Sequence, residues 1–333
     1  MDIKTFLNFV KWQIKGRLPN EEFFIRAFKN PGNFTEDDIS YYLYLCDIYK
    51  QNLPKYLFGS YLINEKQLEN FYSFLDKYKK DNHYEFLIDN KLIRLPIPQK
   101  NDRQFFRNEL FDLILPYLAD YPQVSNIPFH EGPYEYNDVY LGDKDIVLDL
   151  GANVGMFSAF ASAKGCKVYA FEPTKDTIAR YLNITSLLNP NIEIVNMAVS
   201  DKSHIQVPFS IDTENSACNG ITEISDNVFG HNEKSTTVET ITIDDFVKEN
   251  NLNKVDFIKA DIEGAERMML VGAKNTLKEF EPNLSICYYH CLDDYKVLRD
   301  LILDANNNYE IATRYKKIYA HSKTKTKVKS LHH

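Results

Sequence analysis

The stretch that decides the fold is DIVLDLGANVGMFSAF, residues 145–160. An apolar run ends at Asp149, a turn of small residues follows, and an apolar segment of helical character begins near Gly155. Glycine at position 151 lets a ligand approach the backbone closely, and glycine at position 155 lets the helix pack on the strand. The stretch therefore predicts a buried strand, a ligand-binding turn and a helix, in that order.

The sequence from residue 145 onward alternates between short apolar runs and segments of helical character. Strands are expected over residues 145–151, 167–173, 192–200, 255–261 and 283–290, and helices over 155–164, 175–189, 243–250 and 264–279. This alternation predicts an α/β fold in which a mainly parallel, doubly wound sheet carries helices on both faces. Residues 201–241 break the pattern and indicate an inserted hairpin, and two late strands are expected over 309–323.

Residues 1–130 lack this alternation of strands and helices and are expected to form a mainly helical N-terminal region. Helices are predicted over residues 36–51, 65–78 and 103–121, the last of them ended or kinked near Pro116. Between the second and third helices, a hairpin that turns at Asp89-Asn90 is expected. No catalytic pattern stands out in this region. Three roles stay open for it: a cap, a homo-oligomerisation module, or a surface that recognises an acceptor substrate.

Composition and charge narrow the class of protein. The chain has 333 residues, of which 44% are hydrophobic and 26% charged, as in an ordinary globular protein. Its net charge of −8 offers no general attraction to DNA or RNA. No signal-peptide pattern, no apolar run of ~20 residues and no CxxC pair occurs. We therefore expect a cytoplasmic protein without nucleic-acid partners. Residues 324–333 are expected to be a basic tail, whose final Leu-His-His is consistent with a tag remnant.

Polar and small residues gather where five successive strands are expected to end. They are Asp149 to Gly155, Glu172, Met197 to Ser200, Asp261 and His290. In an open parallel sheet the ligand lies beyond the carboxyl ends of the strands, near the point where strand order reverses. Such a series would be unusual for a purely structural sheet. It therefore predicts a binding site at this edge.

The turn after the first strand departs from the GxGxxG pattern of dinucleotide-binding proteins. Counting from Gly151, the second and third glycine positions hold Asn153 and Met156, which disfavours a nicotinamide oxidoreductase. Asp149 can pair with a cationic amino group, and Glu172 can accept hydrogen bonds from two ribose hydroxyls. A ligand with an amino-acid end, a ribose and no phosphate is S-adenosylmethionine (SAM). The alternative is that the two carboxylates only cap helices.

Five motifs, in this order and spacing, resemble the FkbM family of SAM-dependent methyltransferases: VLDLGANVGMFSA, VYAFEP, ETITIDDF, VDFIKADIEGAERMML and GAKNTL. The resemblance covers about residues 131–290, within an expected methyltransferase domain over 131–323. It implies the class I methyltransferase fold, with a seven-stranded Rossmann-like sheet, and usually methylation of a hydroxyl on a sugar or secondary metabolite. By position it implies that SAM is held by Asp149, Gly151, Ala152, Asn153, Gly155 and Glu172, with Met197 and Ala198 near the adenine.

The segment KADIEGAE, residues 259–266, carries three further carboxylates. Asp261 ends a buried strand and is expected to orient the acceptor hydroxyl, contact the amino-acid end of SAM or bind a divalent ion. Glu263 and Glu266 lie in the first turn of the next helix, where the helix dipole favours carboxylates by ~0.3–1 kcal/mol. For these two glutamates a structural role is as reasonable as a contact with the substrate.

His290 ends the fifth expected strand, in the segment SICYYH. An imidazole with a pKa near ~6.5 can take a proton at neutral pH, so His290 is the natural general base for hydroxyl methylation. The alternative is that His290 has a structural role, with its hydrogen bonds made to neighbouring residues. Together with Asp261 it gives only two metal ligands, so no metal site is assigned. Tyr288 suits stacking on a sugar face, and equally suits a core strand.

The expected function is SAM-dependent O-methylation of a hydroxyl on a carbohydrate or glycan precursor. In this hypothesis Asp261 and His290 are catalytic, Glu263 and Tyr288 bind the substrate, and SAM is the cofactor. The alternative is a non-catalytic module that binds SAM or a nucleoside and scaffolds polysaccharide assembly.

Overall fold

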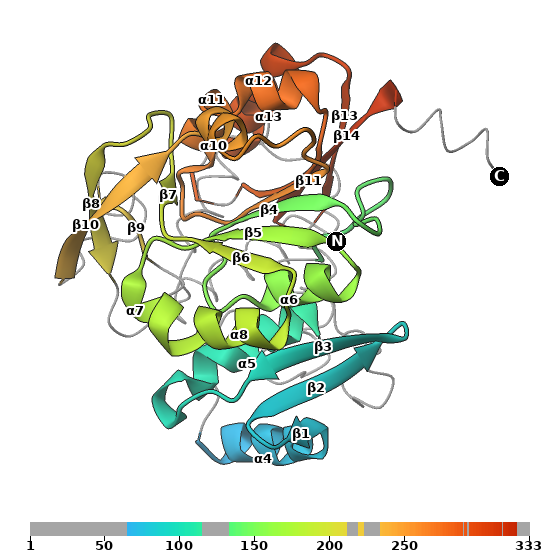
Figure 1. Ribbon diagram of the computed structural model, residues 1–333, viewed down its shortest axis with the longest axis vertical. Coiled ribbons are helices and arrows are strands. Elements are labelled where there is room, and N and C mark those ends of the chain that lie inside the picture. Colours follow the sequence, from blue (N-terminus) through green and yellow to red (C-terminus); the bar gives the residue numbers. More distant parts are fainter. Residues whose placement is uncertain are drawn as a thin grey trace, which may run out of the picture.

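The computed structural model describes residues 65–114, 133–211, 219–222 and 234–324, apart from residues 289, 292 and 315. The helix predicted over residues 36–51, the kink predicted near Pro116 and nearly all of the basic tail lie outside the described residues. The described parts form a central sheet with helices above and below it, a small hairpin sheet at one end and a second small sheet at one side (Figure 1).

The central sheet has seven strands in the order β13-β14-β12-β11-β4-β5-β6. Their bounds are Ile146–Leu150 for β4, Lys167–Phe171 for β5, Ile192–Val195 for β6, Phe257–Ala260 for β11, Asn283–Cys287 for β12, Tyr309–Arg314 for β13 and Lys317–Ser322 for β14. Neighbouring strands from β6 to β12 pair in parallel, and β14 is antiparallel to both β12 and β13. The strand order reverses between β4 and β11. This is the doubly wound, Rossmann-like sheet of the class I methyltransferase fold, as expected.

Helices cover both faces of this sheet (Figure 1). One face carries α6 (Met156–Ala163), α7 (Lys175–Thr177), the π-helical turn Ile178–Leu182 and α8 (Asn183–Leu188). The other carries α10 (Ile243–Glu249), α11 (Glu266–Val271), α12 (Lys274–Glu279) and α13 (Asp294–Ala305). Successive side chains of a strand point to opposite faces. Val147 and Leu148 of β4 accordingly lie in different apolar cores, which explains why consecutive residues of this strand are apolar.

The described part of the N-terminal region mixes helices with a small sheet. Its elements are α4 (Glu65–Leu75), a 3-10 turn (Asp76–Tyr78), β1 (Lys79–Lys80), β2 (His83–Ile88), β3 (Lys91–Pro96), a second 3-10 turn (Lys100–Asp102) and α5 (Arg103–Leu113). The predicted hairpin is confirmed. Asp89 and Asn90 at its tip have φ angles of 47° and 61°, as a two-residue type I′ turn requires. Phe86, Leu95 and Phe106 share one apolar core with Ala159 of α6, so this region is docked on the helices of the central sheet.

The described residues between 198 and 241 form a small sheet, in the region where the sequence indicated an insertion over residues 201–241. The strands β7 (Ala198–Val199), β8 (Gln206–Ile211), β9 (Gly220–Ile221) and β10 (Lys234–Ile241) make a sheet of order β7-β10-β8-β9. β10 pairs antiparallel with β8 and parallel with β7, which continues the chain from β6. The insertion thereby stands beside the carboxyl ends of the central strands. No helix in the described portion of the chain is long and apolar enough to span a membrane.

Candidate active site

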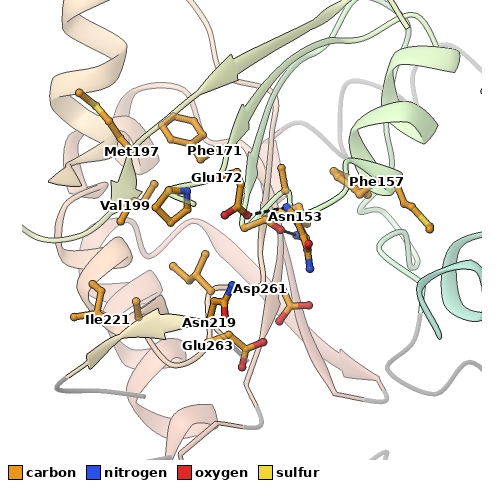
Figure 2. A pocket seen from close by; sticks show the side chains of 18 of the residues that line it. Asn153, Phe157, Phe171, Glu172, Met197, Val199, Asn219, Ile221, Asp261 and Glu263 are labelled. Carbon is orange, nitrogen blue, oxygen red and sulfur yellow. Dashed lines mark hydrogen bonds between the residues drawn. The ribbon is translucent and has the colours of Figure 1, made fainter. Parts of the chain in front are cut away.

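A pocket opens at the carboxyl ends of β4, β5 and β11, where the strand order reverses (Figure 2). The space within it, counted together with its open mouth, is about 860 Å³. Its lining includes most of the residues predicted to hold SAM, namely Gly151, Ala152, Asn153, Glu172, Met197 and Ala198, together with Asp261 and Glu263. Strand ends far apart in the sequence are therefore brought together as predicted.

Gly151 makes the close approach of two strand ends possible. Its φ angle is +74°, and a Cβ atom added there would lie 2.0 Å from the carbonyl oxygen of Asp261. The backbone N–H groups of Gly151 and Ala152 both donate hydrogen bonds to the carbonyl oxygen of Phe171, at 3.1 and 2.8 Å. The turn is thus bonded to β5 and lies tightly against the end of β11, and only glycine fits at its first position.

Asp149 lies beneath the pocket in a buried ion pair with Lys259. The parallel register of β4 and β11 places the two residues directly opposite each other, and their charged atoms are 3.1 Å apart. The Ser158 hydroxyl donates to the second carboxylate oxygen at 2.6 Å. Asp149 is 0% exposed and is not among the residues that line the pocket. Its position therefore differs from the expected direct contact with the amino group of SAM.

Lys259 was not predicted as a site residue from the sequence, although it connects β11 to β4 and to the glycine turn. Its ammonium donates to the carbonyl oxygens of Gly151 and Leu150, at 2.8 and 3.2 Å, in addition to its pairing with Asp149. Burial alone lowers the pKa of Lys259, but Asp149 outweighs that effect and raises it above its ordinary value. A lysine inside the apolar run of β11 was the available signal, because a buried lysine needs a charged partner.

Glu172 closes β5 and is held by the turns on either side. One carboxylate oxygen accepts a hydrogen bond from the Asn153 backbone N–H at 3.1 Å, and the other accepts bonds from the backbone N–H and hydroxyl of Thr174. Burial raises the pKa of Glu172, although these hydrogen bonds oppose the rise. Phe171 and Met197 give the pocket an apolar wall beside this carboxylate (Figure 2).

The pocket fits the SAM that the sequence predicted. The side-chain oxygen of Asn153 is buried and has no hydrogen-bond partner within the described residues, so it can accept a bond from a ligand donor such as an ammonium group. The Glu172 carboxylate can accept from ribose hydroxyls, and the apolar wall suits an adenine ring. The polar end of the pocket suits the amino-acid and ribose parts of SAM, and the apolar end suits its adenine.

An acidic cluster around a histidine lies at the far side of the pocket, which two of its carboxylates line. Asp261 and Glu263 follow β11, Glu266 begins α11, and His290 follows β12. The His290 ring lies between two glutamates, with Nε2 3.2 Å from Glu263 and Nδ1 3.4 Å from Glu266. Tyr134 donates its hydroxyl to Asp261 at 3.2 Å. The sequence alone did not indicate that Glu266 and His290 are in contact.

Burial and mutual pairing shift the pKa values in this cluster. Burial raises the pKa of Glu263 to about 7, despite the opposing effect of His290. For Glu266, burial acts in the same direction, but the nearby imidazole outweighs it and the pKa is lowered. Burial lowers the pKa of His290, yet Glu266 and Glu263 together hold it well above its ordinary value. The two glutamates therefore favour the charged form of the imidazole.

His290 and Tyr288 lie differently from the sequence expectation. Neither residue lines the pocket: the His290 side chain is 0% exposed behind Glu263, and Tyr288 is packed in the apolar core against Tyr295. Gly155 also lies off the lining, at the start of α6 with a φ angle of 83°. A strand end fixes where a residue is but not which way its side chain points.

Several lining residues were not predicted from the sequence. Glu109 and Leu113 come from α5, Tyr134 from the segment before β4, and Phe209, Asn219 and Ile221 from the insertion. They lie outside the strand-end motifs, so local pattern gave no signal for them. The N-terminal region and the insertion thus both contribute side chains to the pocket.

Comparisons of the sequence with known proteins find two similarities. Residues 149–311 match the family model described as Methyltransferase FkbM domain. The hexuronic acid methyltransferase AglP of Haloferax volcanii is 28% identical over 169 residues, which make up 51% of this chain and 66% of that relative, just under two thirds of its length.

Two solved structures are also similar to the chain. Methyltransferase FkbM from Methylobacillus flagellatus KT has 20% identity and a TM-score of 0.42, with 66% of this chain and 52% of that chain covered. A SAM-dependent methyltransferase from Aquifex aeolicus has 16% identity and a TM-score of 0.30, with 55% and 84% covered. The matched family segment begins at Asp149 and contains the glycine turn, Glu172 and the acidic cluster. Over residues 149–311 this chain is therefore similar to the FkbM methyltransferase domain.

Proposed function

We propose that the protein is a SAM-dependent methyltransferase that methylates a hydroxyl group of a carbohydrate or glycan precursor. The observation that carries this proposal is the pocket in which Glu172 and the unsatisfied oxygen of Asn153 stand beside an apolar wall. The similarity to a hexuronic acid methyltransferase supports a sugar as acceptor.

Each part of the pocket has a role in this proposal. Glu172 accepts hydrogen bonds from the ribose hydroxyls, Met197 and Ala198 border the adenine, and Asn153 accepts from the amino-acid end. Asp149 acts as a positioning residue, because its ion pair with Lys259 fixes the carbonyl groups of the glycine turn. Gly151 and Ala152 shape the backbone against which the cofactor lies, and Gly155 starts the helix behind it.

Asp261 and Glu263 are the residues that we assign to the acceptor. When bound, SAM supplies a methyl group whose bond to sulfur breaks as its bond to the acceptor oxygen forms, which leaves S-adenosylhomocysteine and one proton. The two carboxylates line the pocket and can orient the acceptor hydroxyl by accepting its hydrogen bond. His290 does not serve as the base in this proposal, since its ring lies behind Glu263 and outside the lining of the pocket.

The N-terminal region is proposed to recognise the acceptor. Glu109 and Leu113 of α5 reach the pocket, which also has Tyr134 and Phe157 in its lining. Carboxylate and aromatic side chains are suited to sugar hydroxyls and sugar ring faces respectively. Of the three roles that the sequence left open for residues 1–130, we therefore favour acceptor recognition.

Replacing Glu172 with glutamine tests the cofactor assignment. Glu172→Gln retains the size of the side chain but removes the charge that strengthens the bonds to the ribose hydroxyls. Bonds to charged groups contribute about 1.5–3 kcal/mol, so we expect SAM to bind about tenfold to a hundredfold more weakly, as measured by isothermal titration calorimetry.

Glu193→Gln is the matched control for this experiment. Glu193 lies on the neighbouring strand β6, where it pairs with Lys167 at the surface and does not line the pocket, so SAM affinity should not change. Equal SAM affinity of Glu172→Gln and the unsubstituted protein would refute the ribose contact. Tight binding of NAD without any binding of SAM would refute the whole assignment.

The scaffold hypothesis remains the second candidate, and turnover separates it from the first. Incubation with SAM and a glycan extract should release S-adenosylhomocysteine if the protein is an enzyme. A scaffold would bind SAM and release none.

A further inference from the structure

We propose that Asp261, Glu263 and His290 form a binding site for a divalent transition-metal ion such as Mn²⁺, at the acceptor side of the pocket. Two carboxylates and one imidazole supply the donors. The inference deepens the proposed function, because the ion would bind the oxygen that is to be methylated.

The three donors converge because of the sheet. β11 and β12 pair in parallel, with Ala260 opposite Ile286, so the segments that follow these strands leave the sheet side by side. One ligand atom from each of Asp261, Glu263 and His290 lies within 4.8 Å of the other two. Small movements of the side chains toward a common centre would give a metal with three protein ligands.

Neighbouring side chains form hydrogen bonds or ion pairs with the three donors, as the residues around a metal site commonly do. If Nε2 of His290 faces the ion, Nδ1 faces Glu266, at 3.4 Å. Histidine ligands commonly donate their second ring N–H to a carboxylate, which fixes the tautomer and orients the ring. Glu266 is itself fixed, since it accepts a bond from the Ile262 backbone N–H at 2.9 Å. Tyr134 holds Asp261 in the same way.

Charge also favours a cation at this place. Glu266 and the His290 side chain are 1% and 0% exposed, and the Glu263 side chain is 13% exposed. Three carboxylates, those of Asp261, Glu263 and Glu266, lie around this imidazole. Grouping like charges in a poorly solvated place is costly. A divalent ion between the donors would reduce the repulsion among the carboxylates.

The donor set indicates the type of ion and its role. Carboxylates suit Mg²⁺ and Mn²⁺, whereas imidazole suits transition metals, so Mn²⁺ satisfies both kinds of donor. Asp261 and Glu263 line the pocket, so the remaining coordination positions face the acceptor. An acceptor hydroxyl bound there would be held in place and made more acidic, and its proton would pass to water at the pocket mouth.

Titration of metal-stripped full-length protein with Mn²⁺ tests the proposal. Electron paramagnetic resonance measures the free Mn²⁺ that remains, and one saturable equivalent per chain is expected. Glu263→Gln and Asp261→Asn, which preserve side-chain size, should each weaken binding at least about tenfold, the lower end of the cost of outer-shell changes. Glu266→Gln should weaken it about tenfold to a hundredfold. Circular dichroism establishes that each variant is folded.

His204→Ala provides a matched control. His204 also lies between two glutamates, with Nδ1 3.1 Å from Glu239 and Nε2 2.8 Å from Glu249, but it is exposed and outside the pocket. This variant should bind Mn²⁺ like the unsubstituted protein.

The outcomes separate the cation site from the proposed function. Absence of stoichiometric Mn²⁺ binding, or equal binding by Glu263→Gln and Asp261→Asn, would overturn the site. Binding of Mn²⁺ without any binding of SAM would leave the site standing and remove the methyltransferase assignment. Full methyl transfer by the stripped protein in excess chelator would overturn the role of the ion in the reaction.

Discussion

Replacing Lys259 with methionine is expected to lower the free energy of unfolding by about 3–5 kcal/mol, the usual cost of removing one partner from a buried ion pair. The side chains of Lys259 and Asp149 are 5% and 0% exposed, so neither charge is stabilised by bulk water. Without the ammonium, Asp149 keeps, among the described side chains, only the hydrogen bond from Ser158. Urea denaturation, followed by circular dichroism, measures the loss.

Two further variants establish whether the charge pair causes that loss. In Asp149→Asn combined with Lys259→Met neither charge is left alone, so most of the lost stability should return. Lys167→Met removes the lysine of a surface pair, where Lys167 and Glu193 are 2.7 Å apart and 40% and 52% exposed. That change should cost no more than about 1 kcal/mol. A loss in the Lys259 variant as small as this would contradict the assignment of a buried charge pair.

The substitution Gly151→Ala is expected to destabilise the fold by about 2–5 kcal/mol, the sum of the costs of left-handed backbone and of overpacking. The new Cβ atom would lie 2.0 Å from a backbone oxygen of Asp261, which cannot rotate away as a side chain can. The strand ends of β4 and β11 would have to separate. Because those ends form the pocket, SAM binding should be lost along with stability.

Gly142→Ala serves as the control for this prediction. The three heavy atoms nearest to its Cβ atom would all belong to the Asp145 side chain, the first of them at 3.0 Å, and its φ angle is not in the left-handed region. We expect a loss of less than about 1 kcal/mol, in line with small effects at sites where the neighbour can move. Thermal unfolding and calorimetry with SAM check both variants. Unchanged stability and SAM affinity in Gly151→Ala would contradict the tight turn.

The order of elements could be predicted from the sequence because it depends on local patterns. Apolar runs of β4 and β5 alternate with helical segments, and the Asp89-Asn90 pair favours the φ angles of a tight hairpin. The glycine turn and Glu172 follow from the same logic, since parallel strands present their carboxyl ends at one edge. These features need no knowledge of distant contacts.

The parts that could not be predicted depend on register and side-chain direction. Lys259 pairs with Asp149 only because β11 lies beside β4 in one particular register, which links residues far apart in the chain. His290 was expected to face the pocket because it follows a strand, yet its ring points to Glu263 and Glu266. Glu109 enters from α5, and no local pattern near it indicates a pocket.

The apolar core shared by the hairpin region and the methyltransferase sheet has a practical consequence for expression. Phe86, Leu95 and Phe106 pack together with residues of α6, so a shortened chain beginning at residue 131 would leave that helix without its cover. Such a truncation would expose apolar side chains of α6 to solvent and promote aggregation. A shortened chain for crystallisation should therefore retain the segment from residue 65 onward.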